Sequence, residues 1–221
     1  MMEAIVWKEI RETIRDRNML SSILSISLLM ILLNLTSFKL LIANTETFIA
    51  YMAPCIGVLV GFSLGYRFTR EKMEGVLETL LCTPLTLKEL WLGKVIGLTI
   101  PSYATSVVIV LILTLMRGLT IGGAMLAYIL LALPMFIASV IGLLGYLQYI
   151  LGMKQIQALN FVVFFTLFAT LYMVIRRLPH ENTVITWSNV GAAITLTSAI
   201  LATTYYLVTR LSKEKVILEI S

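Results

Sequence analysis

Charged residues are scarce in this chain. Only 13% of its 221 residues are Asp, Glu, Lys or Arg, whereas 59% are hydrophobic. A water-soluble domain carries about twice that charged fraction, so the composition excludes an ordinary soluble protein. Together with a mean hydropathy of +0.94, it predicts an all-α, polytopic membrane protein.

Histidine and cysteine are also rare. His180 is the single histidine and lies between Pro179 and Glu181, a setting typical of a solvated loop residue rather than a ligand. The two cysteines fall in an apolar run (Cys55) and a polar stretch (Cys82), at different expected depths. No Cys or His spacing typical of a metal site is present. The sequence therefore predicts no disulfide, no metal and no cofactor in this chain.

Several function classes lack the residues that they require. The net charge is +5, but no basic patch interleaves with stacking aromatics, so nucleic acid is not an expected partner. The chain has no G-x-x-x-x-G-K-[ST] loop for ATP. Its apolar runs offer no Asp pair, His cluster or Ser-Lys pair for chemistry. We therefore do not expect an enzyme.

Apolar runs fill most of the chain. A helix needs about 20 apolar residues to cross the hydrocarbon layer. Six stretches meet this requirement, and we expect each to be a transmembrane helix: Leu20–Phe38, Phe48–Tyr66, Val95–Met116, Ala124–Leu147, Ala158–Ile175 and Val190–Val208. Within them, Pro101 and Pro134 can kink spans three and four.

Basic residues predict the orientation. They gather in the N-terminal tail, in the loop after span two and in the C-terminal tail, which places both termini in the cytoplasm of a multi-pass protein of the cell membrane. Aromatic residues near the cytoplasmic span ends predict a belt at the lipid–water interface. These residues are Tyr66, Trp91, Tyr149, Tyr205 and Tyr206.

The predicted spans contain no ionisable side chain. Proton relays, voltage sensors and most ion-coupled carriers need such groups inside the membrane. A channel or secondary carrier is therefore a weaker interpretation, and energy for any transport should enter elsewhere. The apolar spans favour an amphipathic or lipid-like cargo, or a small drug or peptide.

Residues 1–18 precede the six-span domain of residues 19–221. Trp7, Ile10 and Ile14 recur at helical spacing, with charged residues around them. This pattern predicts an amphipathic helix that lies in the membrane interface. A simple anchor for span one is an equally good interpretation.

The cytoplasmic loop 67–94 is the longest polar stretch. Apolar residues from Met73 to Leu81 form one stripe and Arg70, Glu71, Glu74 and Glu78 the opposite face, which predicts an amphipathic helix that continues span two. Pro84 ends it. Thr86 and Glu89 predict a capping box that starts the helix of span three. Since about four residues would join two antiparallel helices, the loop is either a docking surface or a solvated cover.

This loop resembles the second-span loop of type-2 ABC exporter membrane subunits. The pattern is Glu71-x-x-x-Gly75-x-Leu77-Glu78-x-Leu80-Leu81-x-Thr83-Pro84-Leu85-x-x-x-Glu89-Leu90-x-Leu92-Gly93-Lys94. The length, the six spans and the N-terminal segment from Arg11 to Leu20 are similar as well. The resemblance implies a coupling helix that docks into a groove of a separate ATPase subunit, which would hold ATP and Mg. It implies these docking residues: Glu71, Glu74, Gly75, Glu78, Leu81, Pro84, Leu85 and Glu89.

A row of glycines follows one face of span two. Gly57, Gly61 and Gly65 repeat every fourth residue and would let another helix approach closely. That helix can belong to the same subunit or to a second one. The resemblance implies a dimer, formed by two copies or with a homologous subunit.

One alternative from another class stays open. The chain can be a non-transporting membrane scaffold that docks a cytoplasmic ATPase. The haem-exporter B subunits of cytochrome c maturation have a similar length and layout. Their role is close to that of such a scaffold.

Overall fold

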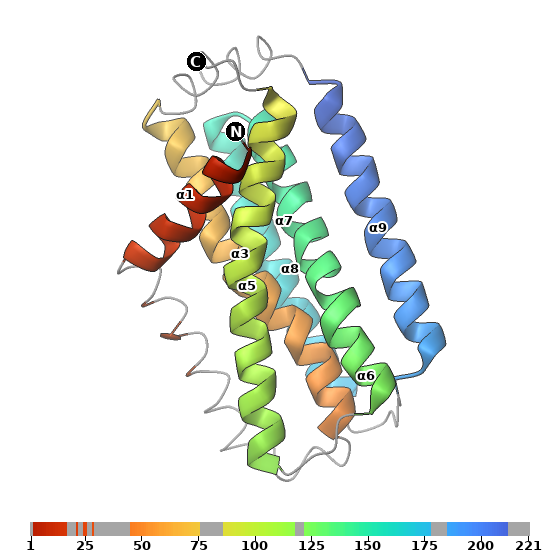
Figure 1. The fold of residues 1–221 in the computed structure, drawn as a ribbon. Helices are drawn as coiled ribbons and strands as arrows, with labels where there is room; N and C mark the ends of the chain where they lie inside the picture. The colour runs from red at the N-terminus through yellow and green to blue at the C-terminus, as the bar shows by residue number, and fades with distance from the viewer. Residues whose placement is uncertain are drawn as a thin grey trace.

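The computed structural model describes residues 2–16, 21, 24, 25, 28, 45–75, 86–117, 122–177 and 185–211. Every regular element within these residues is a helix (Figure 1). In chain order the elements are α1 (Met2–Arg15), α3 (Thr45–Met73), α5 (Leu87–Arg117), α6 (Gly123–Ala127), the π-helix η1 (Tyr128–Ala132), α7 (Leu133–Ile150), α8 (Met153–Arg177) and α9 (Trp187–Thr209).

Four helices of the described part are long and apolar enough to cross a membrane. They cover Ala50–Lys72, Leu87–Leu115, Gly123–Ile150 and Trp187–Thr209. These match predicted spans two, three, four and six. Helix α8 includes predicted span five, but its crossing of the membrane stays a prediction. Predicted span one, Leu20–Phe38, lies almost wholly outside the described residues.

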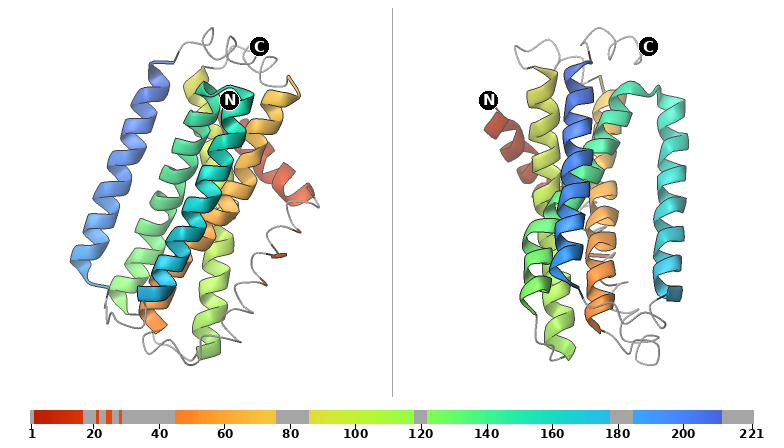
Figure 2. Two further views of the ribbon diagram at one scale, coloured as in Figure 1. Left: turned by 180° about the vertical axis from the view of Figure 1, so that it is seen from behind. Right: turned by 90° about the vertical axis from the view of Figure 1, so that its right-hand side faces the viewer.

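The long helices form a bundle in which α3, α7 and α9 run in one direction and α5 and α8 in the other (Figure 1). Helices α3, α5 and α7 pack on one another, and α9 lies along α7. Helix α8 stands apart from the other long helices in the side view of Figure 2. Helix α3 ends at Met73 and α5 begins at Leu87 at the same end of the bundle, which we call the charged end. Helix α1 lies obliquely across the bundle near this end (Figure 1).

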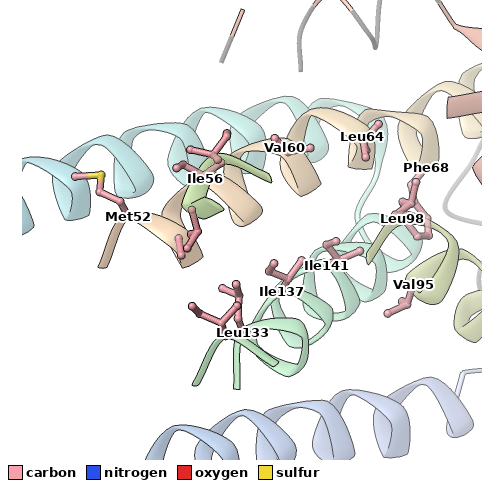
Figure 3. Packing of buried hydrophobic residues seen from close by; sticks show 14 of the residues in the cluster. Met52, Ile56, Val60, Leu64, Phe68, Val95, Leu98, Leu133, Ile137 and Ile141 are labelled. Atoms are coloured by element: carbon pink, nitrogen blue, oxygen red, sulfur yellow. The ribbon is translucent and has the colours of Figure 1, made fainter. Parts of the chain in front are cut away.

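The bundle core runs along α3. Fully or nearly buried side chains recur every fourth residue and pack against α7 and α5 (Figure 3). On α3 these are Met52, Ile56, Val60, Leu64 and Phe68. A helix positions residues four apart on one face, so a single stripe of α3 faces both neighbours.

A π-helical turn precedes Pro134. Proline has no amide hydrogen, so the Leu130 carbonyl cannot receive its usual helical hydrogen bond. The chain widens into the turn Tyr128–Ala132 before the α-helix resumes, which is one way in which a helix accommodates such a break. Pro101, in contrast, lies inside α5, and the α-helix continues through it.

Two members of the predicted aromatic belt are instead part of the core. Trp91 is 0% exposed and Tyr149 is 1% exposed. The Trp91 indole packs against Gly142 and donates a hydrogen bond to its carbonyl oxygen at 3.2 Å. The prediction was wrong for these residues: Gly142 leaves room for the Trp91 ring, and the Tyr149 ring packs edge-on against Phe68. Tyr66, Tyr205 and Tyr206 are exposed.

Candidate functional site: a charged joint between three helices

Four charged side chains meet at the charged end, where α1 crosses α3 and α5. We call them the junction cluster: Glu9 of α1, Arg67 and Glu71 of α3, and Lys94 of α5. All four are buried. Buried charges are costly unless they are paired. The contacts among these four side chains therefore determine whether the junction cluster stabilises the helix crossing.

Glu9 connects α1 to α3. Arg67 Nη1 donates to the Glu9 backbone carbonyl at 3.0 Å and to its Oε2 at 3.3 Å. Burial raises the pKa of the Glu9 carboxyl above its ordinary value, and Lys94 and Arg67 oppose that rise. Glu71 raises the same pKa further. Lys94 and Arg67 therefore stabilise the charged form of Glu9 against the cost of burial.

Gly97 lets α1 lie close to α5. A Cβ atom at this position would be 2.7 Å from the Glu9 Cβ and 3.5 Å from the Val6 carbonyl oxygen. Real Cβ atoms essentially never approach another atom to within 3.0 Å, so the contact with Glu9 excludes a side chain here. The absence of a side chain at Gly97 is therefore what brings Glu9 within reach of α3 and α5.

Glu71 connects α3 to α5 through an ion pair with Lys94. The side chains are 11% and 3% exposed. Lys94 also lies over the Phe68 ring, 4.8 Å from its centroid, and Lys8 of α1 approaches Glu71 at 3.8 Å. Glu71 was predicted on the polar face of an amphipathic helix, together with Arg70 and Glu74. Contacts with α1 and α5 bury Glu71, whereas Arg70 and Glu74 are exposed.

Lys72 ties the end of α3 to the end of α7. Its Nζ donates to the Leu151 carbonyl at 2.7 Å and to the Gln148 carbonyl at 3.5 Å. The last carbonyls of a helix have no partner within the helix, and a cation there also suits the helix dipole. Three long helices and α1 are thus fastened together at the charged end.

The helix predicted to continue past Met73 ends there. Glu74 and Gly75 form a turn, and Gly75 has φ +69°, a conformation that favours glycine. Glu74 is exposed and pairs with Arg70 at 3.2 Å. The predicted docking residues Glu78, Leu81, Pro84 and Leu85 lie outside the described residues.

The predicted capping box at Thr86 is confirmed. The Glu89 amide donates to Thr86 Oγ1 at 3.3 Å, and the Thr86 amide donates to Glu89 Oε2 at 3.0 Å. Both helix ends that flank residues 76–85 are therefore well defined. The predicted docking residue Glu89 has a local role as the partner of Thr86.

The glycines of α3 mainly allow close packing against another helix of the same chain. A Cβ at Gly57 would be 2.3 Å from Ile137 Cδ1, and one at Gly61 would be 2.8 Å from Ile141 Cδ1. Both neighbours belong to α7. A Cβ at Gly65 would meet no described atom within 4 Å. The interpretation as packing within one subunit therefore holds for Gly57 and Gly61.

The sequence analysis missed Glu9, Arg67 and Lys94 as members of a site. One signal was available: Arg67 and Glu71 are four residues apart and border the buried stripe of Leu64 and Phe68. Within the described residues, no group of three or more His, Cys, Asp and Glu side chains could hold a metal ion. The contacts of the junction cluster thus hold α1, α3 and α5 in a fixed arrangement.

No model of a known protein family matches this sequence, and no curated protein matches it either.

Proposed function

We propose that this chain is the membrane subunit of an ATP-driven transporter, an ABC exporter whose ATPase is a separate subunit. One observation carries the proposal. Helices α3 and α5 are fastened together by Glu71 and Lys94, directly beside a segment bounded by the Gly75 turn and the Thr86 capping box. A passive connection needs neither a buried ion pair nor two defined helix ends.

The junction cluster is suited to passing a movement of the cytoplasmic loop to the membrane helices. A displacement of residues 76–85 would act on the ends of α3 and α5 together, since their ion pair and their shared core resist separation. Glu9 and Lys72 would carry the movement to α1 and α7. Packed helices that move as one body are a common basis of hinge and shear transitions.

The burial of Glu71 changes which residues should face the ATPase. Its carboxylate is engaged by Lys94, so we assign Glu71 to the joint. Glu74 is exposed and adjoins the segment that holds Glu78, Leu81, Pro84 and Leu85. These five residues are the proposed docking residues, with Gly75 and Glu89 shaping the two ends.

The complete transporter would contain two membrane subunits in the cell membrane, either two copies or this chain and a relative. Both termini would be cytoplasmic, and ATP and Mg would bind the ATPase subunits alone. The apolar spans favour an amphipathic cargo.

A pull-down tests the proposal. The full chain is co-expressed with the ATPase encoded beside its gene and purified in mild detergent. We expect wild type to retain the ATPase and the triple variant Glu74→Ala, Glu78→Ala, Leu85→Ala to lose most of it. Glu3→Ala is the control, because Glu3 is an exposed acid on α1, far along the chain from the loop.

A second variant separates docking from transmission. Glu71→Ala should still bind the ATPase, but hydrolysis should no longer respond to cargo or to the membrane subunit. ATPase binding that is unaffected by the triple variant would contradict the assigned docking surface. No ATPase binding by wild type would contradict the transporter proposal itself and favour a channel or another scaffold.

A further inference from the structure

A proline inside α3 leaves one backbone carbonyl without its helical donor. Pro54 has no amide hydrogen, so the carbonyl of Ala50, four residues earlier, loses the hydrogen bond that an α-helix supplies. Ala50 begins the part of α3 that is apolar enough to span the membrane. A carbonyl without a donor is costly in hydrocarbon. The Ala50 carbonyl therefore needs a donor from another part of the chain.

Tyr128 of η1 supplies this donor. Its hydroxyl donates to the Ala50 carbonyl oxygen at 3.1 Å, although the two residues are 78 positions apart in the sequence. We call this hydrogen bond the latch. It lies at the end of the bundle opposite the charged end, where α3 begins and α6 leads into η1 (Figure 1).

The π-helical turn determines which way Tyr128 points. Ile137 faces α3 (Figure 3), where its Cδ1 lies 2.3 Å from the place of a Cβ at Gly57. In a regular α-helix Tyr128, nine residues before Ile137, would lie about 180° around the axis from it. The i→i+5 hydrogen bonds of η1 add one residue to the turn, which reduces this angle to roughly 80°. The break before Pro134 thus brings the Tyr128 hydroxyl to the side of α3.

The latch joins two helices where each is interrupted by a proline. Sharp bends in helices occur at prolines and at π-helical turns, because the backbone there lacks part of its regular hydrogen bonding. Residues 45–53 of α3 and residues 123–127 of α6 lie beyond these breaks, toward the same end of the bundle. Each segment can change its angle to the rest of its helix with little loss of helical hydrogen bonds.

A second hydrogen bond fixes the point about which α3 would bend. Ser106 of α5 is 0% exposed and donates to the Ala53 carbonyl oxygen at 2.6 Å. Ala53 directly precedes Pro54, whereas Ala50 lies about one turn farther along the helix. Ser106 therefore holds the pivot of the break, and the latch holds the segment that moves.

We propose that the latch is a conformational switch that closes and opens the bundle at the end opposite the charged end. In the closed state, the Tyr128 hydroxyl satisfies the Ala50 carbonyl and holds the first turns of α3 on η1. In the open state, α3 bends at Pro54 and water replaces Tyr128 as the donor, because the helix itself has none to offer. Opening therefore admits water beside Pro54. The proposal does not depend on the ATPase partner.

Labelling of Cys55 tests the proposal. Cys55 directly follows Pro54 and is half-buried, and its thiol reacts as the thiolate, which burial in apolar surroundings disfavours. The full chain with Cys82→Ala is reconstituted in lipid vesicles, and its labelling rate with N-ethylmaleimide is measured by mass spectrometry. Tyr128→Phe keeps the ring and removes the hydroxyl. It should raise the labelling rate about fivefold, which corresponds to about 1 kcal/mol for the lost hydrogen bond.

Pro54→Ala separates the latch from other contacts of Tyr128. Alanine restores an amide hydrogen for the Ala50 carbonyl, so the Tyr128 hydroxyl is no longer required. In the Pro54→Ala background, Tyr128→Phe should change the labelling rate by less than about 1.5-fold. Tyr146→Phe is the matched control, because it removes the hydroxyl of another half-buried tyrosine, on α7, and it should label as the Cys82→Ala parent does.

Two results would overturn the proposal. The first is a labelling rate of Tyr128→Phe equal to that of Tyr146→Phe, which would show that the hydroxyl does not hold the closed state. The second is the same increase on Tyr128→Phe with and without Pro54→Ala, which would assign the effect to a contact other than the Ala50 carbonyl. Elution volume in gel filtration shows that each variant is folded before the rates are compared.

Discussion

At the scale of single residues, the junction cluster resolves an apparent conflict. Lys, Arg, Asp and Glu are almost never fully buried unless they are paired, yet this chain buries them where three helices cross. Their contacts are complementary: Arg67 faces Glu9, and Lys94 faces Glu71. The cluster therefore favours one arrangement of α1, α3 and α5 over others that would leave a charge unpaired.

Removing both members of a buried pair should cost less than the two single removals added together. We expect Glu71→Ala and Lys94→Ala each to lower the free energy of unfolding by about 3 kcal/mol, because each leaves an uncompensated buried charge. The double variant should cost less than the sum by about 1–2 kcal/mol. Unfolding by SDS in mixed micelles, followed by tryptophan fluorescence, measures the cycle. Lys8→Ala, at an exposed position of the same site, should stay within about 0.5 kcal/mol of wild type. Strict additivity of the two alanine changes would show that the pair does not couple α3 to α5.

Glu9 should give stability a characteristic pH dependence. Its folded-state pKa is raised, first by burial, with Lys94 and Arg67 opposing and Glu71 adding to the rise. The folded protein therefore binds this proton more readily than the unfolded chain does, and stability should increase as pH falls through the raised pKa toward 4.5. We expect the apparent Tm of wild type, minus that of Glu9→Gln, to increase on acidification over this window. Glu3→Gln provides the baseline for an exposed acid. An unchanged difference between wild type and Glu9→Gln would mean that Glu9 titrates as it does in the unfolded chain.

At the scale of elements, hydropathy and local sequence signals predicted where the helices lie. They did not predict the side-chain contacts between helices. Apolar length was enough to locate α3, α5, α7, α8 and α9. The Thr86–Glu89 box was readable because capping depends on residues three apart. The end of α3 was placed too late, because α3 ends at Met73 and is followed by the turn at Gly75, whereas the predicted helix continued past both residues.

Burial of polar and aromatic side chains was the part that the sequence did not reveal. Trp91 and Arg67 have side chains that usually lie at an interface or in solvent. Their burial depends on residues far along the chain: Gly142 makes room for Trp91, and Glu9 accepts from Arg67. Such contacts follow from how helices cross, which local patterns do not encode.

The glycines of α3 give a test of helix packing. Gly57→Ala should lower the free energy of unfolding by about 1–3 kcal/mol, because its Cβ would overlap Ile137 of α7. Gly65→Ala should be neutral or stabilising by up to about 1 kcal/mol, since it adds a good helix former where space is open. Both are measured by unfolding in mixed micelles. A loss of dimer with Gly65→Ala, seen by light scattering, would instead place Gly65 at a seam between subunits.

At the scale of the whole molecule, the helices differ in how far the bundle covers them. In the candidate span of α3, 67% of an apolar stretch of 18 residues is buried inside the bundle, against 17% of the corresponding stretch in α9. Helix α8 exposes several large side chains, among them Phe161, Val162 and Phe165, and stands apart from the rest in Figure 2. Lipid tails are as apolar as these side chains, so close packing against another helix is what would favour a contact there.

These differences predict where a second copy would dock. Because α3 is already enclosed, we expect the seam of a dimer to include the exposed face of α8. With Cys55 and Cys82 changed to Ala, the variants Phe161→Cys and Phe165→Cys should form disulfide-linked dimers in membranes under mild oxidation. Leu196→Cys on α9 is the control, because Leu196 is 61% exposed, comparable with the 67% of Phe161 and Phe165. Cross-linking at Leu196 with none on α8 would move the seam to α9. Equal, weak cross-linking at every position would indicate random collision in the membrane, and the face of α8 would then be in contact with lipid.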